Sequence, residues 1–158
     1  LTIHSSRNRF AVRLNSGVIA MNMNISDIAN TYGRLKSVYS IRAQFDGESD
    51  MVVAVQLVFE KGEVYHESLP EYDEISCSEK LSGEWIELDL ISIDVSQEPP
   101  WIFALNCEVL WVWTMTNHQG YDDAMQYSFA SPVLGNSQII QLVTVASAIK
   151  VYGFVEKL

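Results

Sequence analysis

The sequence lacks the short motifs through which many enzymes can be recognised. It contains no glycine-rich phosphate loop of the form G-x-G-x-x-G or G-x-x-x-x-G-K-[ST], no G-x-S-x-G turn for a nucleophilic serine and no H-E-x-x-H pair for zinc. The three histidines, His4, His66 and His118, are far apart and share no metal-ligand spacing. We therefore expect neither a cofactor nor a metal ion, and an enzyme is the less favoured class.

Cysteines and long apolar runs are also scarce. Cys77 and Cys107 are the only cysteines and form no C-x-x-C pair, which favours the reducing cytoplasm over a disulfide framework. No apolar run approaches the roughly 18 residues that cross a bilayer. The apolar stretch 17–21, which follows Arg13, is too short for the core of a signal peptide. We expect a cytoplasmic protein without membrane contact.

Positive charge is the third scarcity. The chain has 20 acidic against 10 basic residues, a net charge of −10. Residues 43–123 hold eighteen acids against Lys61 and Lys80, which gives −16, whereas residues 1–42 carry +5. Phosphate repels such a segment, so we expect no binding to nucleic acid or to anionic membranes. The charge favours a basic protein partner, and high solubility is the alternative explanation.

Hydrophobic and aromatic residues, in contrast, are abundant. Hydrophobic residues make up 48% of the chain, with four tryptophans and seven tyrosines among them. Such a composition is typical of a packed globular core rather than a disordered chain. The length of 158 residues corresponds to one domain. We predict that residues 1–158 form a single domain with its main β-rich part at 21–158, and that residues 1–20 form an N-terminal arm or an edge strand.

Apolar and polar residues alternate along most of the chain, which is the period of a half-buried β-strand. Two hairpins are the clearest, one over 51–69 and one over 107–129. The first should reverse at Lys61-Gly62, where Gly62 is expected to supply a positive φ. The other predicted strands span 35–45, 85–95, 139–145 and 149–155.

Helical signals are few and short. Ser26 can cap the orphan N–H groups of a helix that ends at Gly33, and Pro100 can open a single helical turn. No long amphipathic helix is available to cover a parallel sheet. The sequence therefore predicts a mainly β fold (α+β with few short helices), built as one curved antiparallel sheet that is half-barrel or sandwich-like.

The segment 117–123 is the one local cluster of polar side chains. In a catalytic interpretation His118 would do acid–base chemistry with Asp122 or Asp123. In a structural interpretation, which we favour, the segment is a turn in which Gly120 supplies the unusual backbone angle. Successive residues of a strand point to opposite faces, so the two aspartates are poorly placed to share a metal ion.

Acidic residues after the first hairpin form a second candidate site. They would dock a basic protein and raise its rate of encounter, or they would form a solvated rim over the core. The residues of this candidate binding surface are Glu71, Asp73, Glu74, Glu79 and Glu84.

The tryptophans Trp111 and Trp113 are two residues apart, so they share one face of the predicted strand. A partner or ligand could stack on that face. We favour a role in the core, because Val109 and Met115 alternate in step with them.

The run from Trp111 to Asp123, followed by alternating Tyr127 and Phe129, resembles a segment of small bacterial proteins of unknown function. The resemblance covers residues 111–129. It implies a bacterial, cytosolic origin and implies no particular activity.

Three functions remain open. The favoured one is a small acidic protein-binding module, immunity- or antitoxin-like, that neutralises or docks a basic partner. The second is a structural domain that forms a homodimer through exposed edge strands at 9–14 or 149–155. The third is a small-molecule enzyme that uses His118 and Asp122.

Overall fold

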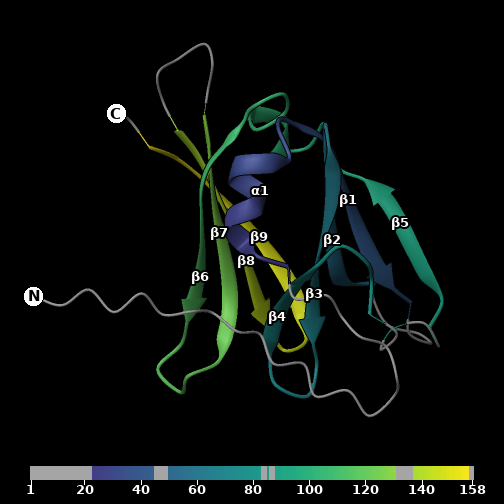
Figure 1. Ribbon diagram of the computed structural model, residues 1–158. Helices are drawn as coiled ribbons and strands as arrows, with labels where there is room; N and C mark the ends of the chain where they lie inside the picture. The colour runs from purple at the N-terminus through teal and green to yellow at the C-terminus, as the bar shows by residue number, and fades with distance from the viewer. Residues whose placement is uncertain (1–22, 45–49, 83–84, 86–87, 131–136, 157–158) are drawn as a thin grey trace, which may run out of the picture.

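The computed structural model describes residues 23–44, 50–82, 85, 88–130 and 137–156, which form two antiparallel β-sheets and one α-helix (Figure 1). The predicted mainly β, antiparallel class is confirmed. Among the described strands no barrel closes, and the two sheets face each other as layers. The predicted N-terminal arm, 1–20, lies outside the described residues.

One sheet has five strands in the order β4-β3-β2-β1-β5, and the other has four in the order β6-β7-β8-β9. The strands of the first sheet are β1 Leu35–Ala43, β2 Met51–Phe59, β3 Gly62–Leu69, β4 Glu74–Ser78 and β5 Leu90–Asp94. Those of the second sheet are β6 Val109–Thr116, β7 Asp122–Ala130, β8 Ser137–Val145 and β9 Ala148–Glu156. The helical segments are α1 Ile25–Thr31 and the 3-10 turn η2 Trp101–Phe103.

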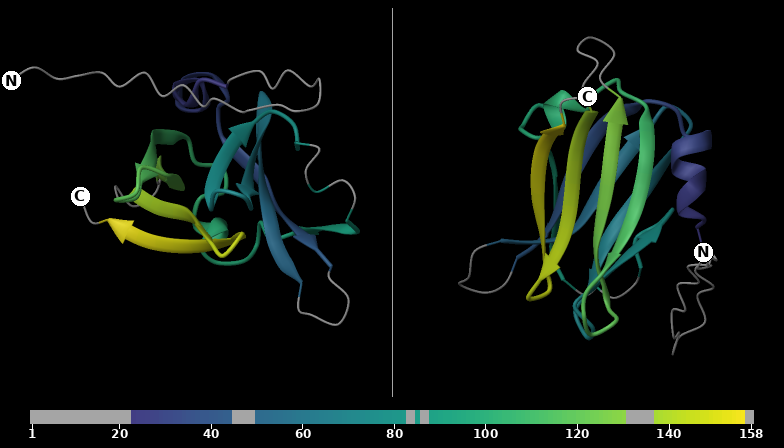
Figure 2. Two further views of the ribbon diagram at one scale, coloured as in Figure 1. Left: turned by 90° about the horizontal axis from the view of Figure 1, so that it is seen from below. Right: turned by 90° about the vertical axis from the view of Figure 1, so that its left-hand side faces the viewer.

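The core lies between the two sheets, where branched and aromatic side chains alternate inward from both. Figure 2 shows the sheets as separate layers, with α1 alongside the β6 edge. Ile28 of α1 closes the side of the same core and is fully buried. The largest buried side chains of the four-stranded sheet are Tyr127, Phe129, Met125, Ile140 and Leu142. No helix among the described residues is long and apolar enough to cross a membrane.

Helix α1 is confirmed, but its N-cap differs from the prediction. Asn24 is the capping residue, and its Oδ1 accepts from the backbone N of Ser26 at 3.2 Å and from the Ser26 hydroxyl at 2.7 Å. Ser26 therefore lies within the first turn rather than before it. Gly33 has a φ of 77° and ends the helix as predicted.

The hairpin of β2 and β3 is confirmed, although Gly62 does not act as predicted. Its φ is not positive; it is the first residue of β3 and pairs with Phe59. A Cβ at this position would lie 3.1 Å from the ring of Tyr32, so the glycine allows the chain to approach that ring. Residues 60 and 61 make the reversal, and Lys61 donates its backbone N–H to the Tyr32 carbonyl at 3.1 Å.

The segment after β3 departs most from the prediction. It contains β4, which the sequence does not reveal because Ile75 and Cys77 supply only two alternating apolar positions. The strand predicted over 85–95 is shortened to β5. Trp85 does not extend it; its buried indole packs in a second, smaller cluster and donates Nε1–H to the Ser68 carbonyl at 3.1 Å.

A β-bulge in β6 decides which face its tryptophans occupy. Val109 lies opposite Phe129 in the core, but Trp111 lies opposite Ser128, which belongs to the other face of β7. Trp111 and Trp113 are consequently 63% and 42% exposed. Their predicted core role is wrong, while their position on a common face is confirmed.

Candidate functional site

Two acidic segments that are far apart in the sequence lie at the same end of the molecule. The turn between β3 and β4 and the loop between β6 and β7 lie together at the lower end in Figure 1 and in the right-hand view of Figure 2. Glu74 is the first residue of β4, and Asp122 is the first residue of β7. Burial raises the pKa of the Glu74 carboxyl, and the charge of Asp122 raises it further. We call Glu71, Asp73, Glu74, Asp122 and Asp123 the acidic end.

Asp73 joins the acidic end to a third turn. Its Oδ1 accepts from the backbone N of Ser147 at 3.0 Å, in the turn between β8 and β9. Asp73 has a φ of 50°, and Ala146 and Ser147 also have positive φ. Aspartate accepts this left-handed conformation in turns more readily than most other residues do. Three turns from both sheets thus meet at this end.

The five residues of the predicted acidic surface do not all lie together. Glu71 is exposed in the turn before β4. Glu79 follows β4 at its opposite end and accepts from the Tyr32 hydroxyl at 2.8 Å. Burial, followed by this hydrogen bond, raises the pKa of Tyr32 to about 12. Glu84 lies outside the described residues. The structure therefore brings three of the five predicted residues together and separates Glu79 from them.

The loop at 117–123 is held by Asn117, as the turn interpretation predicts. Its Oδ1 accepts from the backbone N of Gln119 at 2.9 Å and of Tyr121 at 3.2 Å. Its Nδ2 donates to the Asp123 carboxylate at 3.2 Å. Gly120 has a φ of 91°. These bonds account for the polar composition of the loop without a ligand.

His118 lies exposed at the tip of this loop and has no hydrogen bond or ion pair among the described residues. The nearby carboxylates are engaged elsewhere: Asp122 accepts from the Thr116 hydroxyl at 2.5 Å, and Asp123 accepts from Asn117. The structure therefore does not join the imidazole to either acid. No group of three or more potential metal ligands occurs in the described part of the chain.

No carboxylate of the acidic end forms an ion pair within the described part of the chain. The two ion pairs of the described residues are Arg34–Glu108 at 3.7 Å and Lys36–Glu60 at 3.0 Å. Both involve β1 or the residue before it, in the basic N-terminal part of the chain. The carboxylates of Asp73, Asp122 and Asp123 accept from a backbone N–H, a hydroxyl and an amide group, none of which carries a positive charge. Such a surface attracts cations without enclosing one.

A buried polar pair between the sheets was missed by the sequence analysis. Nε2 of His66 on β3 contacts the hydroxyl of Tyr127 on β7, and both side chains are fully buried. Burial lowers the pKa of His66 from 6.5 to about 4, against a smaller opposing effect of the Ser76 backbone. The alternation of His66 with the buried Val64 was the available signal, since it predicts an inward imidazole.

Two polar atoms on the inner face of β3 lack hydrogen-bond partners within the described structure. They are Nδ1 of His66 and Oγ of Ser68. The intervening Glu67 points to the other face, where it is also buried and accepts from the backbone N of Ser82 at 2.8 Å and its hydroxyl at 2.7 Å. His66 and Glu67 are therefore separated by the sheet and form no common site.

Comparison with known proteins assigns a family but no activity. No curated protein and no solved structure matches the chain. The profile of a family of unknown function, DUF6334, matches residues 21–157. The resemblance to an uncharacterised family is thereby confirmed. The chain belongs to the DUF6334 family.

Proposed function

We propose that this domain is a small acidic protein-binding module of the bacterial cytoplasm that docks or neutralises a basic protein, as an immunity protein or an antitoxin does. The observation that carries the proposal is the acidic end. There Glu74 and Asp122 come from different sheets, lie close enough to raise the pKa of Glu74 and form no ion pair among the described residues. A cationic side chain of a partner would relieve this repulsion.

The distribution of charge supports a protein partner rather than a single ion. The carboxylates come from the β3–β4 turn and from the first residues of β4 and β7, and all five are exposed or partly exposed. Several lysine or arginine side chains on one surface would match them. The field of a chain with a net charge of −10 would also raise the rate of encounter with such a partner.

The cysteines support the cytoplasmic setting. Cys77 and Cys107 are both free thiols, and they lie on β4 and before β6 respectively. A domain that matures in an oxidising compartment commonly uses its cysteines in disulfides. Free thiols are the ordinary state in the cytosol.

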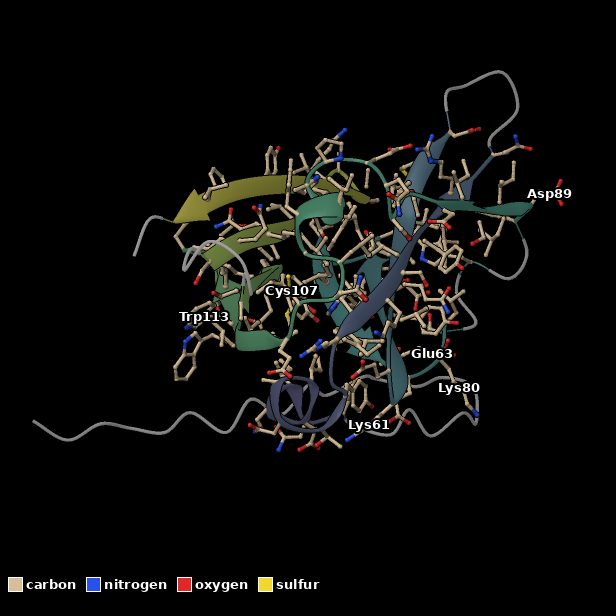
Figure 3. All side chains as sticks on the ribbon, turned by 90° about the horizontal axis from the view of Figure 1, so that it is seen from above. Lys61, Glu63, Lys80, Asp89, Cys107 and Trp113 are labelled. Carbon is tan, nitrogen blue, oxygen red and sulfur yellow. The ribbon has the colours of Figure 1, made fainter. Side chains whose placement is uncertain are left out.

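The test compares capture by three forms of the full chain. Wild type, Glu74→Gln/Asp122→Asn and the control Asp89→Asn/Glu98→Gln are immobilised and exposed to lysate of the source cell. Both variants lose two charges, but Asp89 precedes β5, at the far edge of the five-stranded sheet from β4 (Figure 3). Bound proteins are identified by mass spectrometry and then titrated in purified form.

We expect one basic protein to bind wild type and the control equally and to bind Glu74→Gln/Asp122→Asn about fivefold or more weakly, the effect of losing about 1 kcal/mol of charge interaction. Binding to all forms should weaken as salt rises. Failure to enrich any basic protein would overturn the proposal. Equal affinity for the three forms would overturn the assignment to the acidic end.

A further inference from the structure

The outer face of the four-stranded sheet exposes large apolar side chains in register. Trp113 on β6 lies opposite Gln126, which lies opposite Gln141, which lies opposite Tyr152 on β9. The neighbouring row begins with Trp111 and ends with Phe154. The row on the other side runs Met115, Ala124, Val143 and Lys150. We call these three rows of four residues the aromatic face.

The large side chains of the aromatic face are on its two edge strands. Tyr152 and Phe154 are 46% and 51% exposed, comparable to the two tryptophans. The rings of Trp111 and Trp113 lie 6.5 Å apart and form a ridge along β6. Figure 3 shows Trp113 projecting from β6 away from the rest of the domain.

The centre of the face is less exposed than its edges and mixes two glutamines with small and β-branched residues. Ser128 and Ala124 on β7 are buried, and Gln141 donates its amide to Gln126 at 2.6 Å across the two central strands. This bond satisfies one donor and one acceptor that would otherwise face an apolar partner.

The near absence of charge on the aromatic face indicates which kind of partner it binds. Among its twelve residues only Lys150 is charged, although the chain carries ten more acids than bases. The face therefore offers no carboxylate to a basic partner. A nearly uncharged face is typical of the centre of a protein interface, where charged residues are depleted. None of the twelve residues is an acid, so no carboxylate within the face opposes contact between two copies.

We propose that the aromatic face binds the same face of a second copy of this chain. Its five large side chains, each 40–63% exposed, leave on the order of 500 Å² of apolar surface for burial. That is a large patch for a monomer, where the largest is about 300–600 Å². With the adjoining Leu110 and Val145, also exposed, it approaches the ~800 Å² per partner of a standard interface. A dimer of moderate affinity follows.

The two copies pack as stacked sheets rather than as one continuous sheet. A two-fold axis along the strands, between β7 and β8, sets β6 of each copy over β9 of the other, so Trp111 and Trp113 meet the edge that carries Tyr152 and Phe154. This contact leaves the acidic end free. It also predicts a salt response opposite to that of the basic partner: salt screens the repulsion between two negative chains and strengthens the dimer.

Sedimentation velocity of the full-length chain, from micromolar to millimolar concentration, tests the proposal. Two variants each remove the large side chains of one edge strand of the aromatic face. They are Trp111→Ala/Trp113→Ala on β6 and Tyr152→Ser/Phe154→Ser on β9. The control, Tyr72→Ser/Phe103→Ser, removes two aromatic side chains that are 51% and 59% exposed but lie outside the face. Thermal unfolding of each variant checks that the fold is kept.

We expect a dimer for wild type and control, and a dissociation constant raised about 30-fold or more in both face variants, the effect of losing one interface tryptophan worth about 2 kcal/mol. Glu74→Gln/Asp122→Asn should dimerise like wild type, so failure of the basic-partner proposal leaves this one standing. A monomeric wild type, or a dimer that survives in both face variants, would overturn it. A monomer that instead binds lipid vesicles or a polysaccharide through Trp111 would overturn it equally.

Discussion

The imidazole of His66 on β3 and the phenol of Tyr127 on β7 are hydrogen-bonded across the interior between the two sheets, with ring centroids 5.4 Å apart and planes inclined by 71°. Tyr127 also stacks on Phe129 at 5.7 Å. The pair thus ties the cores of the two sheets together through one directional contact, in a region otherwise filled by apolar side chains.

This pair predicts a loss of stability in mild acid. The folded pKa of His66 is lowered from 6.5 to about 4, so the unfolded chain binds more protons between these values. Its neutral form contributes fully above pH 6.5, and the contribution falls by roughly 3 kcal/mol as the pH falls to 4. Urea unfolding should show that wild type loses more stability over this window than His66→Phe/Tyr127→Phe. Parallel curves for the two proteins would contradict the assignment.

The tautomer of His66 follows from its hydrogen bond. The Tyr127 hydroxyl has no partner among the described residues other than Nε2, so donation from Tyr127 to Nε2 leaves one unpaired donor, the Nδ1–H. The reverse direction would leave both the hydroxyl proton and a lone pair on Nδ1 unpaired, which costs more. ¹⁵N NMR at neutral pH should therefore show a protonated Nδ1 and an unprotonated Nε2. Protonation at Nε2 would exclude this arrangement.

Removal of the Glu74 charge should stabilise the fold. Because burial and Asp122 raise the folded pKa of Glu74, the favourable state is the protonated one, present below the carboxyl's ordinary pKa and lost as the pH rises through its folded pKa. Glu74→Gln should be more stable at neutral pH by less than about 1 kcal/mol, since solvent screens a partly exposed group. The gain should vanish in acid. Glu98→Gln, an exposed acid outside the acidic end, is the control in the same unfolding experiment.

Replacing Gly153 or Gly120 with alanine should lower the free energy of unfolding, for a different reason at each position. At Gly153 a Cβ would overlap Pro100, whose ring packs against β9, so Gly153→Ala should cost about 1–3 kcal/mol of unfolding free energy through overpacking. At Gly120 nothing lies within 4 Å, but the φ of 91° is unfavourable for alanine and should cost about 1 kcal/mol. Replacing Gly120 with asparagine, which tolerates positive φ better, should recover part of that loss. An equal recovery at Gly153 would contradict the steric explanation.

The sequence predicted the local pairings well because short hairpins carry their own signals. The alternation on both sides of Lys61-Gly62 identified β2 and β3, and the β-branched runs near the C-terminus identified β8 and β9. The turn chemistry of Asn117 was also recognised from composition. In each case the residues that decide the structure lie within a few positions of one another.

The sequence predicted individual residues of the candidate sites but not which of them lie together. Nothing in the spacing of Glu74 and Asp122 indicates that they approach, because their proximity depends on how the two sheets pack. The exposure of Trp111 could not be predicted either. The β-bulge adds one residue to β6 and thereby turns Trp111 to the outer face, and the alternation of apolar residues does not reveal a bulge. The contact between His66 and Tyr127 depends on the same packing of one sheet on the other.

The sequence by itself determined the class of this protein: a chain of alternating apolar residues with no long helix forms antiparallel sheets, and most of so large an acidic surplus stays at the surface. Only the tertiary structure decided which side chains meet and which face the solvent. The physical reason is that alternation assigns two faces to each strand but does not say which face is inward. Sheet packing and the β-bulge make that choice, and they buried His66 while exposing Trp111 and Trp113.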